Sequence, residues 1–572
     1  MGGELAAAMT CKYKRRPSDP HPTAFASKRS KCCRPPPFGG RYRAWDRLAL
    51  ALLILAGTVA LLTFRDYGLS WDDYTHSQYG DLLLSFYRSA LRDRRALSWV
   101  NLYYYGGGFD LVSAAAAKVL PLGLFETRRL VGAAVGILGL LVTWRLARRI
   151  AGPLAGFVAL ALLCACPLYW GHMFMNPKDA PFAVAMVILL YAFARALEGY
   201  PRLSLTAAMF VGAGFGLAFG SRIMGAFGAL EFLGPLAFIF VAQARAEGVG
   251  AAGSRLLRFL LALLPAALPA FLVMALVWPW SVIDPLNPLR AVDYFSRFFE
   301  KPWLELFGGS VIPVTEMPRS YIPTLFALQL PELLSALALV GALGVPVMLC
   351  RRDIPLQRRG VFLLVALAAF LPPAIAVALK PAMYNGIRHF IFVLPPLAIL
   401  GGLAAVWLLK AMRSFRIVPI AIAIALAAGL AFPVVEMVRL HPYEYTYFNA
   451  LYGGVRRARA SYMLDYWGLS FKEASQALSA RLAESGEAKP SGRPWKLAVC
   501  GPHRSPQVEL GADFETSWDP AGADFAMMLG EFYCRKFDAP LLAEIVRDGV
   551  TYSRIYDIRG HAYDTLLTVP GL

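Results

Sequence analysis

Apolar runs separated by short basic turns repeat along most of the chain. Each run holds roughly 17 to 25 residues, the length that a helix needs to cross about 30 Å of hydrocarbon. Because a bilayer interior offers no water, the backbone of such a run must satisfy its own hydrogen bonds, as a helix does. The pattern predicts eleven spans, over residues 44–64, 129–147, 153–170, 180–197, 204–221, 223–243, 256–278, 331–350, 359–379, 389–410 and 416–437.

One further apolar stretch, FDLVSAAAAKVLPLGLF (109–125), is barely long enough to cross and contains Lys118 and Pro121. If it crossed, the next span would carry the basic turn RLARR (145–149) to the outer side. If it lies in the membrane interface, that turn stays inside with the other basic turns, as the positive-inside rule favours. We therefore expect an interfacial helix, a cytoplasmic N-terminus, and outer loops over 65–128 and 279–330.

The composition agrees with a membrane protein, because 57% of the residues are hydrophobic and only 17% are charged. A soluble protein usually has about a quarter charged residues. The net charge of +19 comes from Lys and Arg in the turns and near the N-terminus. Membrane orientation explains this better than nucleic-acid binding, so no nucleic-acid partner is expected. Residues 1–43 are predicted to be a disordered basic cytoplasmic arm.

The chain changes character after residue 440. FKEASQALSARL has the period of an amphipathic helix, whereas WKLAVC and YSRIYDIR alternate as strands do. The predicted fold is therefore a polytopic α-helical membrane domain over 44–440, followed by a small extracytoplasmic α/β domain over 441–572. In that compartment Cys500 and Cys534 can form a disulfide.

Acidic residues gather at the outer ends of the predicted spans. SWDDYTHSQYG (70–80) places Asp72 and Asp73 after the first span, and GHMFMNPKDAPF (171–182) adds Asp179. One carboxylate there can take a proton from a nucleophile, and a second can orient the acceptor or hold a divalent cation. Both stretches are also ordinary helix starts, so their spacing alone leaves a purely structural role open.

Two arginines reach the same face, Arg222 in GSRIMG and Arg388 in NGIRHF. An arginine at membrane depth needs an anionic partner, and its planar donors suit a phosphate. Snorkelling to lipid headgroups is the alternative for either one. Glu231 can pair with Arg222 or be a buried structural acid. YYYGGGFD (103–110) offers either an aromatic platform at a sugar or lipid site or an aromatic belt.

In order and sidedness these motifs resemble the GT-C membrane glycosyltransferases. More narrowly, they resemble the group that contains the protein O-mannosyltransferases and the bacterial lipid A aminoarabinose transferases. The resemblance covers residues 45–470, and HPYEYTYFNALYGG…YMLDYWGLSFKEA is similar to a bacterial subset of the group. The matching motifs are WDDYTHSQYG, YYYGGGFD, GHMFMNPKDAPF, VWPWSVIDP, EMPRSYIP and YNGIRHFIFVLPPLAIL.

The resemblance implies transfer of a monosaccharide, with inversion, from a polyprenyl-phosphate carrier to an acceptor on the outer face of a bacterial inner membrane. It requires no nucleotide or other cofactor. It assigns Asp72 as the general base and Asp179 to orienting the acceptor or sugar. Asp73 is also predicted to be catalytic, but it stands where the family usually has a longer glutamate, which leaves a role in positioning the acceptor open. The implied substrate-binding residues are Arg222, Arg388, His389, Tyr321, Tyr105 and Lys178.

Two other functional classes remain open at this point. A transporter or lipid flippase would use the acids as ion sites, although transporters usually place such residues near the bilayer midplane and show internal repeats. A silent scaffold would use the external domain to bind envelope partners. Neither the sugar nor the acceptor, whether lipid, glycan or protein, is indicated by the sequence.

Overall fold

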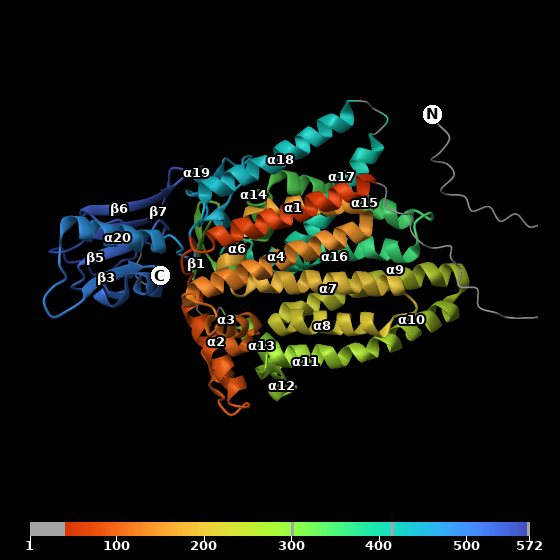
Figure 1. Cartoon of the computed structure of the whole chain (residues 1–572), viewed down its shortest axis with the longest axis horizontal. Helices are drawn as coiled ribbons and strands as arrows, with labels where there is room; N and C mark the ends of the chain where they lie inside the picture. The colour runs from red at the N-terminus through yellow and green to blue at the C-terminus, as the bar shows by residue number, and fades with distance from the viewer. Residues whose placement is uncertain (1–39, 299–302, 413, 415–416, 569–572) are drawn as a thin grey trace, which may run out of the picture. The chain divides into compact units, whose positions relative to one another are not determined.

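The computed structural model describes residues 40–298, 303–412, 414 and 417–568. The basic arm predicted for residues 1–43 lies outside this part of the chain, apart from residues 40–43, which begin the first helix. Within the described residues, long apolar helices are joined to a smaller module with a β-sheet (Figure 1). The predicted fold class, a polytopic helical membrane protein with a C-terminal α/β module, is confirmed.

Nine helices of the described chain are long and apolar enough to cross a membrane. They are α1 (Gly40–Thr63), α4 (Leu124–Ala151), α7 (Asp179–Gly199), α9 (Phe227–Glu247) after the 3-10 turn η3 (Ile223–Ala226), α10 (Val249–Leu263) running through η4 (Leu264–Ala266) into α11 (Ala267–Val277), α15 (Glu332–Cys350), α16 (Leu356–Leu379), α17 (Leu394–Ala411) after η6 (Arg388–Val393), and α18 (Val418–Leu440).

Two of the eleven predicted spans are not simple crossing helices. Span 153–170 is a pair, α5 (Pro153–Cys164) and α6 (Pro167–Met175), bent by 65°. The bend falls at Pro167, which has no backbone N–H and holds the residue before it in an extended conformation. Span 204–221 is α8 (Leu205–Ser221), whose 17 residues reach about 26 Å, slightly less than the hydrocarbon thickness. In the described chain the count is therefore nine, or ten with the bent pair, rather than eleven.

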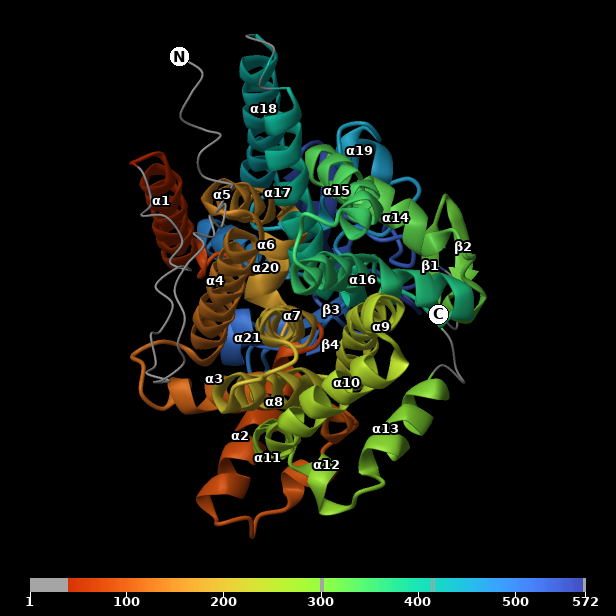
Figure 2. The same cartoon turned by 90° about the vertical axis from the view of Figure 1, so that its right-hand side faces the viewer.

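Helices α7 and α17 are the most enclosed of the crossing helices, whereas α18 and the α10–α11 span are covered by little else. Figure 2 shows α7 near the middle of the bundle, with α1 and α18 at its edge. Asp179 is the first residue of α7, and Arg388 is the first residue of η6, which leads into α17. The two most enclosed spans therefore each begin with a candidate site residue.

The segment between α1 and α4 contains four short helices: α2 (Asp73–Arg88), η1 (Arg95–Ser98), η2 (Leu102–Tyr104) and α3 (Gly108–Ala117). The ten residues of α3 reach about 15 Å, so this helix is too short to cross, as predicted. α2 and α3 pack closely at Gly80, where a Cβ atom would lie 2.5 Å from the Asp110 carbonyl oxygen. This close approach needs glycine, and it brings the acids of α2 next to those of α3.

The segment between α11 and α15 holds a small β-hairpin. After α12 (Trp280–Ile283) and α13 (Asn287–Ser296), strand β1 (Leu304–Phe307) pairs antiparallel with β2 (Ser310–Pro313). Gly308 and Gly309 turn the chain with φ of +63° and +83°, as a two-residue hairpin loop requires. The short helix α14 (Tyr321–Gln329) follows.

The C-terminal module is a mixed five-stranded sheet with strand order β4-β3-β5-β7-β6. β3 is parallel to β4 and β5, whereas β7 is antiparallel to β5 and β6. The two strand patterns read from the sequence correspond to β3 and β7. The elements are α20 (Phe471–Ser485), β3 (Trp495–Cys500), α21 (Arg504–Leu510), β4 (Phe514–Ser517), β5 (Phe525–Leu529), β6 (Leu541–Arg547) and β7 (Val550–Asp557).

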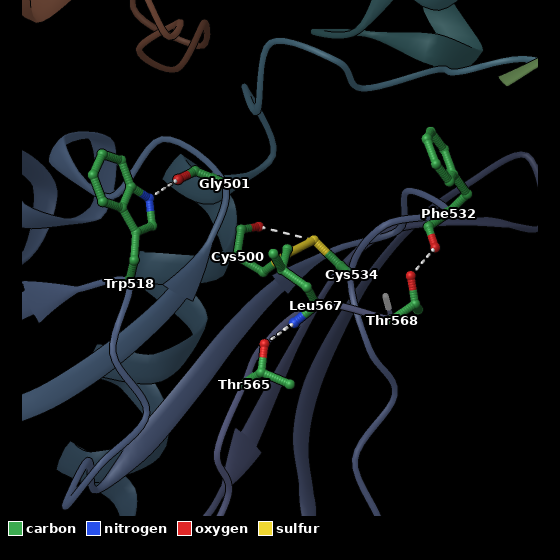
Figure 3. The surroundings of a disulfide bond; sticks show 8 residues. All are labelled: Cys500, Gly501, Trp518, Phe532, Cys534, Thr565, Leu567 and Thr568. Carbon is green, nitrogen blue, oxygen red and sulfur yellow. Dashed lines mark hydrogen bonds between the residues drawn. A yellow bond between two sulfur atoms is a disulfide. The ribbon is translucent and has the colours of Figure 1, made fainter. Parts of the chain in front are cut away.

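A disulfide joins Cys500, at the end of β3, to Cys534, which follows β5 (Figure 3). Nearby, the Trp518 indole N–H donates to the Gly501 carbonyl at 3.0 Å. The Thr568 hydroxyl donates to the Phe532 carbonyl, also at 3.0 Å. The first of these bonds joins the segments that follow β3 and β4, and the second joins the segment that follows β5 to the end of the described chain.

Replacing both Cys500 and Cys534 with serine is expected to lower the free energy of unfolding of the module by about 3–4 kcal/mol. The reason is that the bond joins residues 34 positions apart and restricts the unfolded chain. Reductant should lower the melting temperature of the wild type and leave that of the double variant unchanged. A wild type that melts identically with and without reductant would contradict the bond.

Candidate functional site

Asp179 joins two arginines from different parts of the chain. Its carboxylate accepts a hydrogen bond from Arg388 Nη1 at 2.9 Å and forms an ion pair with Arg222, which follows α8. Asn176 fixes the acid, because its side chain accepts from the Asp179 N–H at 2.7 Å and donates to Asp179 Oδ2 at 2.9 Å. The three charged residues are nearly or fully buried, so the arginines pair with an acid and do not snorkel to headgroups.

Glu231 is not the partner of Arg222. It lies further along α9, is buried, and its Oε1 has no hydrogen-bond partner among the described residues. Asp179 takes that place instead. With its carboxylate occupied by Arg222, Arg388 and Asn176, Asp179 is expected to hold the arginines and not to contact an acceptor, which revises the role that the resemblance implied.

Asp72 lies at the N-terminal cap of α2 and forms an ion pair with Lys178, the residue before α7. The Oδ2–Nζ distance is 2.9 Å, and the side chains are 30% and 14% exposed. Burial alone would raise the pKa of Asp72, but the charges of Lys178, His76 and Arg388 outweigh it and hold the pKa well below its usual range. Asp72 is therefore ionised and partly accessible.

Asp73, the next residue, is 1% exposed and has a different set of partners. Arg129, in α4, donates to both of its oxygens at 3.0 and 2.6 Å, and Ser70 donates through its N–H at 2.8 Å and its hydroxyl at 2.9 Å. Burial would raise the pKa of Asp73, but Arg129 and Arg128 outweigh that effect and lower it. Asp73 therefore fastens α2 to α4, and both of its oxygens are engaged by these partners, so its catalytic role stays a prediction.

A second buried chain of charges continues behind Asp73. Arg128 donates to Asp110 Oδ1 at 2.7 Å, and the other oxygen of Asp110 lies 2.7 Å from His76 Nδ1. All of these side chains are nearly or fully buried. The two arginines lie near the start of α4, and the acids of α2 and α3 neutralise them there.

A cavity of about 840 Å³ lies beside the arginine pair. Its walls are mainly apolar, and it also exposes the cations of Arg222 and Lys380. Such a cavity fits a ligand with an apolar tail and an anionic head. Its lining also includes Tyr105, Phe227, Ile375, Leu379 and His389.

Tyr105 lines this cavity and also lies beside Lys178, the partner of Asp72. The Arg222 guanidinium lies 5.6 Å from the ring centre, and Lys178 Nζ lies 5.5 Å from it. His389 also lines the cavity, and its Nδ1 has no hydrogen-bond partner among the described residues. The structure thus brings Asp72, Lys178, Tyr105, Arg222 and His389 to one region.

The turn before Arg388 is held by side chains of the segment between α11 and α15. Asn385 and Gly386 have φ of +57° and +68°, so their N–H groups point away from ordinary backbone partners. Glu305 Oε2 accepts from the Asn385 N–H at 2.6 Å, and the Tyr321 hydroxyl accepts from the Gly386 N–H at 3.1 Å. Tyr321 in turn donates to Glu305 Oε1 at 2.6 Å. Tyr321 is fully buried among these hydrogen bonds and does not line the cavity. The structure therefore does not bring it to the cavity as the predicted substrate-binding role would require.

Several of these residues escaped the sequence analysis although the sequence carried signals for them. Glu305 is an acid in the otherwise apolar strand LELF, which indicates a buried, paired carboxylate. Arg128 and Arg129 stand at the predicted outer end of a span, against the positive-inside rule, which indicates local counter-charges. His76 and Asp110 gave no comparable signal.

A divalent cation at Asp72 and Asp73 does not fit the geometry. The two carboxylates face different partners, Lys178 for one and Arg129 for the other. Among the described residues no group of three or more His, Cys, Asp or Glu side chains is arranged to hold a metal ion.

Asp73→Asn is expected to lower the free energy of unfolding by on the order of 3 kcal/mol, because it leaves the buried charge of Arg129 without its anion. Asp72→Asn, the matched change one residue earlier, should cost less than about 1 kcal/mol because its ion pair is partly exposed. Thermal unfolding in detergent compares the two. Equal losses would contradict the different roles.

The burial of Glu305 predicts that the free energy of unfolding depends on pH. Burial raises the pKa of Glu305 to about 7, above the unfolded value of 4.5. The folded state then holds a proton that the unfolded state has lost, so this residue makes stability fall as pH rises from about 4.5 to about 7.

Glu305→Gln should therefore show a shallower fall in melting temperature between about pH 5 and pH 8 than the wild type. Glu316→Gln changes an exposed acid of the same loop and should keep the wild-type slope. Parallel slopes for all three proteins would show that Glu305 is not protonated in the folded state.

Comparison with known proteins gives one family match and several distant structural matches. Residues 123–280 match the family of dolichyl-phosphate-mannose-protein mannosyltransferases. No curated protein matches the chain by sequence. ArnT from Cupriavidus metallidurans in the apo state is 15% identical, over 90% of this chain and 98% of that chain, with a TM-score of 0.47.

The same ArnT bound to undecaprenyl phosphate is 16% identical, over 91% of this chain and 99% of that chain, with a TM-score of 0.45. The oligosaccharyltransferase of Archaeoglobus fulgidus in the apo form is 13% identical, over 82% and 64%, with a TM-score of 0.46. The segment matched by the family includes Asp179 and Arg222. Through residues 123–280 the chain thus matches the dolichyl-phosphate-mannose-protein mannosyltransferases, and its predicted resemblance to the GT-C membrane glycosyltransferases is confirmed.

Proposed function

We propose that this integral membrane protein is a glycosyltransferase that moves a monosaccharide from a polyprenyl-phosphate carrier to an acceptor on the outer face of the membrane. The observation that carries the proposal is the position of Asp72. This partly exposed, ionised carboxylate is paired with Lys178, whose ammonium lies 5.5 Å from the ring centre of Tyr105, and Tyr105 lines an apolar cavity with a cationic end. A lipid phosphate in the cavity and a nucleophile at the carboxylate would therefore meet.

The charges of the site suit a phosphodiester. Lys178, Arg222 and Arg388 supply three positive charges, and Asp72 and Asp179 supply two negative ones. The remaining positive charge, to which Lys380 of the cavity adds another, suits the single negative charge of a sugar–phosphate–lipid diester. Arginine also binds phosphate oxygens with two parallel hydrogen bonds. The apolar walls, which include Phe227, Ile375 and Leu379, would enclose the first isoprene units.

The proposed reaction is a single displacement. The acceptor hydroxyl or amine attacks the anomeric carbon, and its proton passes to the Asp72 carboxylate. The bond from the anomeric carbon to the phosphate oxygen breaks, and its electron pair stays on the phosphate. Arg222 and Arg388 stabilise the growing phosphate charge, so no general acid is needed. Attack opposite the leaving group inverts the anomeric carbon. No step requires a nucleotide, another cofactor or a divalent cation.

The proposed location is a bacterial inner membrane, with the N-terminus in the cytoplasm and the site and C-terminal module outside it. The disulfide between Cys500 and Cys534 supports this orientation, because such bonds persist in oxidising compartments. The acceptor is a glycolipid, polysaccharide or protein of the envelope.

The alternative is a transporter or flippase, and one observation favours it. Glu231 is a buried acid inside the α9 span, and its Oε1 has no hydrogen-bond partner among the described residues, as an ion-carrying site within the membrane can have. The other acids of the site stand at the starts of α2 and α7, which favours chemistry at the membrane surface.

The test is comparative mass spectrometry of envelope lipids, glycans and proteins from a strain that lacks the gene. The deletion strain is complemented with the wild-type gene, with Asp72→Asn or with Asp81→Asn. The last variant is the control, because it makes the same change at a half-exposed acid of α2. One monosaccharide mass increment should disappear and return with wild type and Asp81→Asn only. Its return with normally expressed Asp72→Asn would refute the base. No change in the deletion strain would favour the transporter.

A further inference from the structure

Lys178 stands between the proposed base and the proposed donor phosphate. In the structure its ammonium group is paired with Asp72 at 2.9 Å. It also lines a small cleft together with Arg222, Tyr105 and Ser221. One lysine thus touches the carboxylate on one side and borders the phosphate-binding arginine on the other.

The Asp72–Lys178 pair is the pair at this site that a ligand can reach most readily. Its side chains are 30% and 14% exposed. In contrast, the Asp179 and Asp73 carboxylates are each held by an arginine and are 2% and 1% exposed. Lysine also moves more freely than arginine, since its single ammonium sits on a flexible stem without a planar fork to align. A change of partner on ligand binding is therefore easiest at Lys178.

We propose that Lys178 couples the two substrates: it holds Asp72 in the resting protein and transfers to the phosphate when the donor binds, which leaves Asp72 free to act as the base. This inference rests on the proposed function and adds an order to it, with the donor binding before the acceptor is activated.

The electrostatics of Asp72 support this order. While Lys178 is paired with it, the pKa of Asp72 is held well below its usual range, against the opposing effect of burial. A carboxylate of such low basicity takes a proton poorly. Loss of the lysine to a phosphate raises the pKa of Asp72 and so improves the base only when the sugar is in place.

The inference predicts an unusual effect of a base mutation on binding. The donor phosphate competes with Asp72 for Lys178, so Asp72→Asn should bind the donor more tightly than the wild type does. Lys178→Met should bind it more weakly. In Asp72→Asn/Lys178→Met the gain should vanish, because the competition acts through Lys178 alone.

The probe is the methyl phosphodiester of a short isoprenol, which carries one fixed negative charge and cannot react by losing a sugar. Calorimetric titration near pH 7 gives its dissociation constant for each purified protein in detergent. We expect about threefold to tenfold tighter binding for Asp72→Asn, about tenfold weaker binding for Lys178→Met, and the Lys178→Met value for the double variant. Asp81→Asn, a change of equal charge on the same helix, should match the wild type.

Unchanged or weaker binding by Asp72→Asn overturns the inference, and its melting temperature shows that the variant is folded. The inference is also overturned if Asp72→Asn tightens binding of the probe equally in the Lys178→Met protein. The tighter binding would then come from the loss of a negative charge near the phosphate and not from the release of Lys178. An ordinary diacyl phosphodiester lipid should show no Lys178-dependent gain, and a gain as large as that of the isoprenyl probe would overturn the donor-specific order. If the wild type does not bind the isoprenyl probe at all, the proposed function fails and the inference with it.

Discussion

The ion pairs of Asp179 with Arg222 and Arg388 are the interaction on which the rest of the site depends. A charged side chain at membrane depth is costly unless an opposite charge is near. Here the acid begins α7, one arginine follows α8, and the other begins the turn into α17. Neutralising the three charges therefore also fixes the ends of three helices.

The neighbouring residues Asp72 and Asp73 show how helix geometry separates two tasks. Successive residues at a helix start point about 100° apart. Asp73 faces α4 and is enclosed by Arg129, whereas Asp72 faces Lys178 and keeps contact with solvent. The enclosed pair stabilises the fold, and the accessible pair can exchange partners. Adjacent acids with the same chemistry thus differ in function because of the surfaces that they meet.

The loop between α11 and α15 completes this arrangement from a distance. The turn that presents Arg388 uses left-handed residues whose N–H groups have no regular backbone partners, and Glu305 and Tyr321 bind two of them. The loop therefore fixes the backbone that leads to Arg388. In this way it positions the guanidinium, although the hydrogen bonds of Glu305 and Tyr321 go to the turn and not to the guanidinium itself. Changes in this loop are expected to affect phosphate binding through Arg388.

Much of the fold could be predicted from the sequence, because apolar length and period are local properties. The long apolar helices, the shorter helix α3 and the strands WKLAVC and YSRIYDIR all follow from local pattern. Pro167 is a local signal for a bend, and the prediction of one straight span over 153–170 does not use it. The motifs also pointed to the region of Asp72, Asp179, Arg222 and Arg388.

Partner choice could not be predicted in the same way, because it depends on which helices meet. The sequence left open whether Asp73 was solvated, whether Tyr321 faced a substrate, and whether Glu231 or another acid met Arg222. Each was decided by residues far away in the chain, namely Arg129, Glu305 and Asp179. Long-range charge pairing is thus the part of this site that sequence pattern specifies least.

The central claim is that the cavity beside Asp72 binds a lipid phosphate by its cationic end. The most direct measurement is an electron cryomicroscopy structure of the protein with a bound isoprenyl phosphodiester. The account predicts the phosphorus beside Arg222, across Tyr105 from Asp72, with the isoprenoid between α9 and α16. A phosphate bound away from this cavity, with Arg222 and Lys178 still on their present partners, would contradict it.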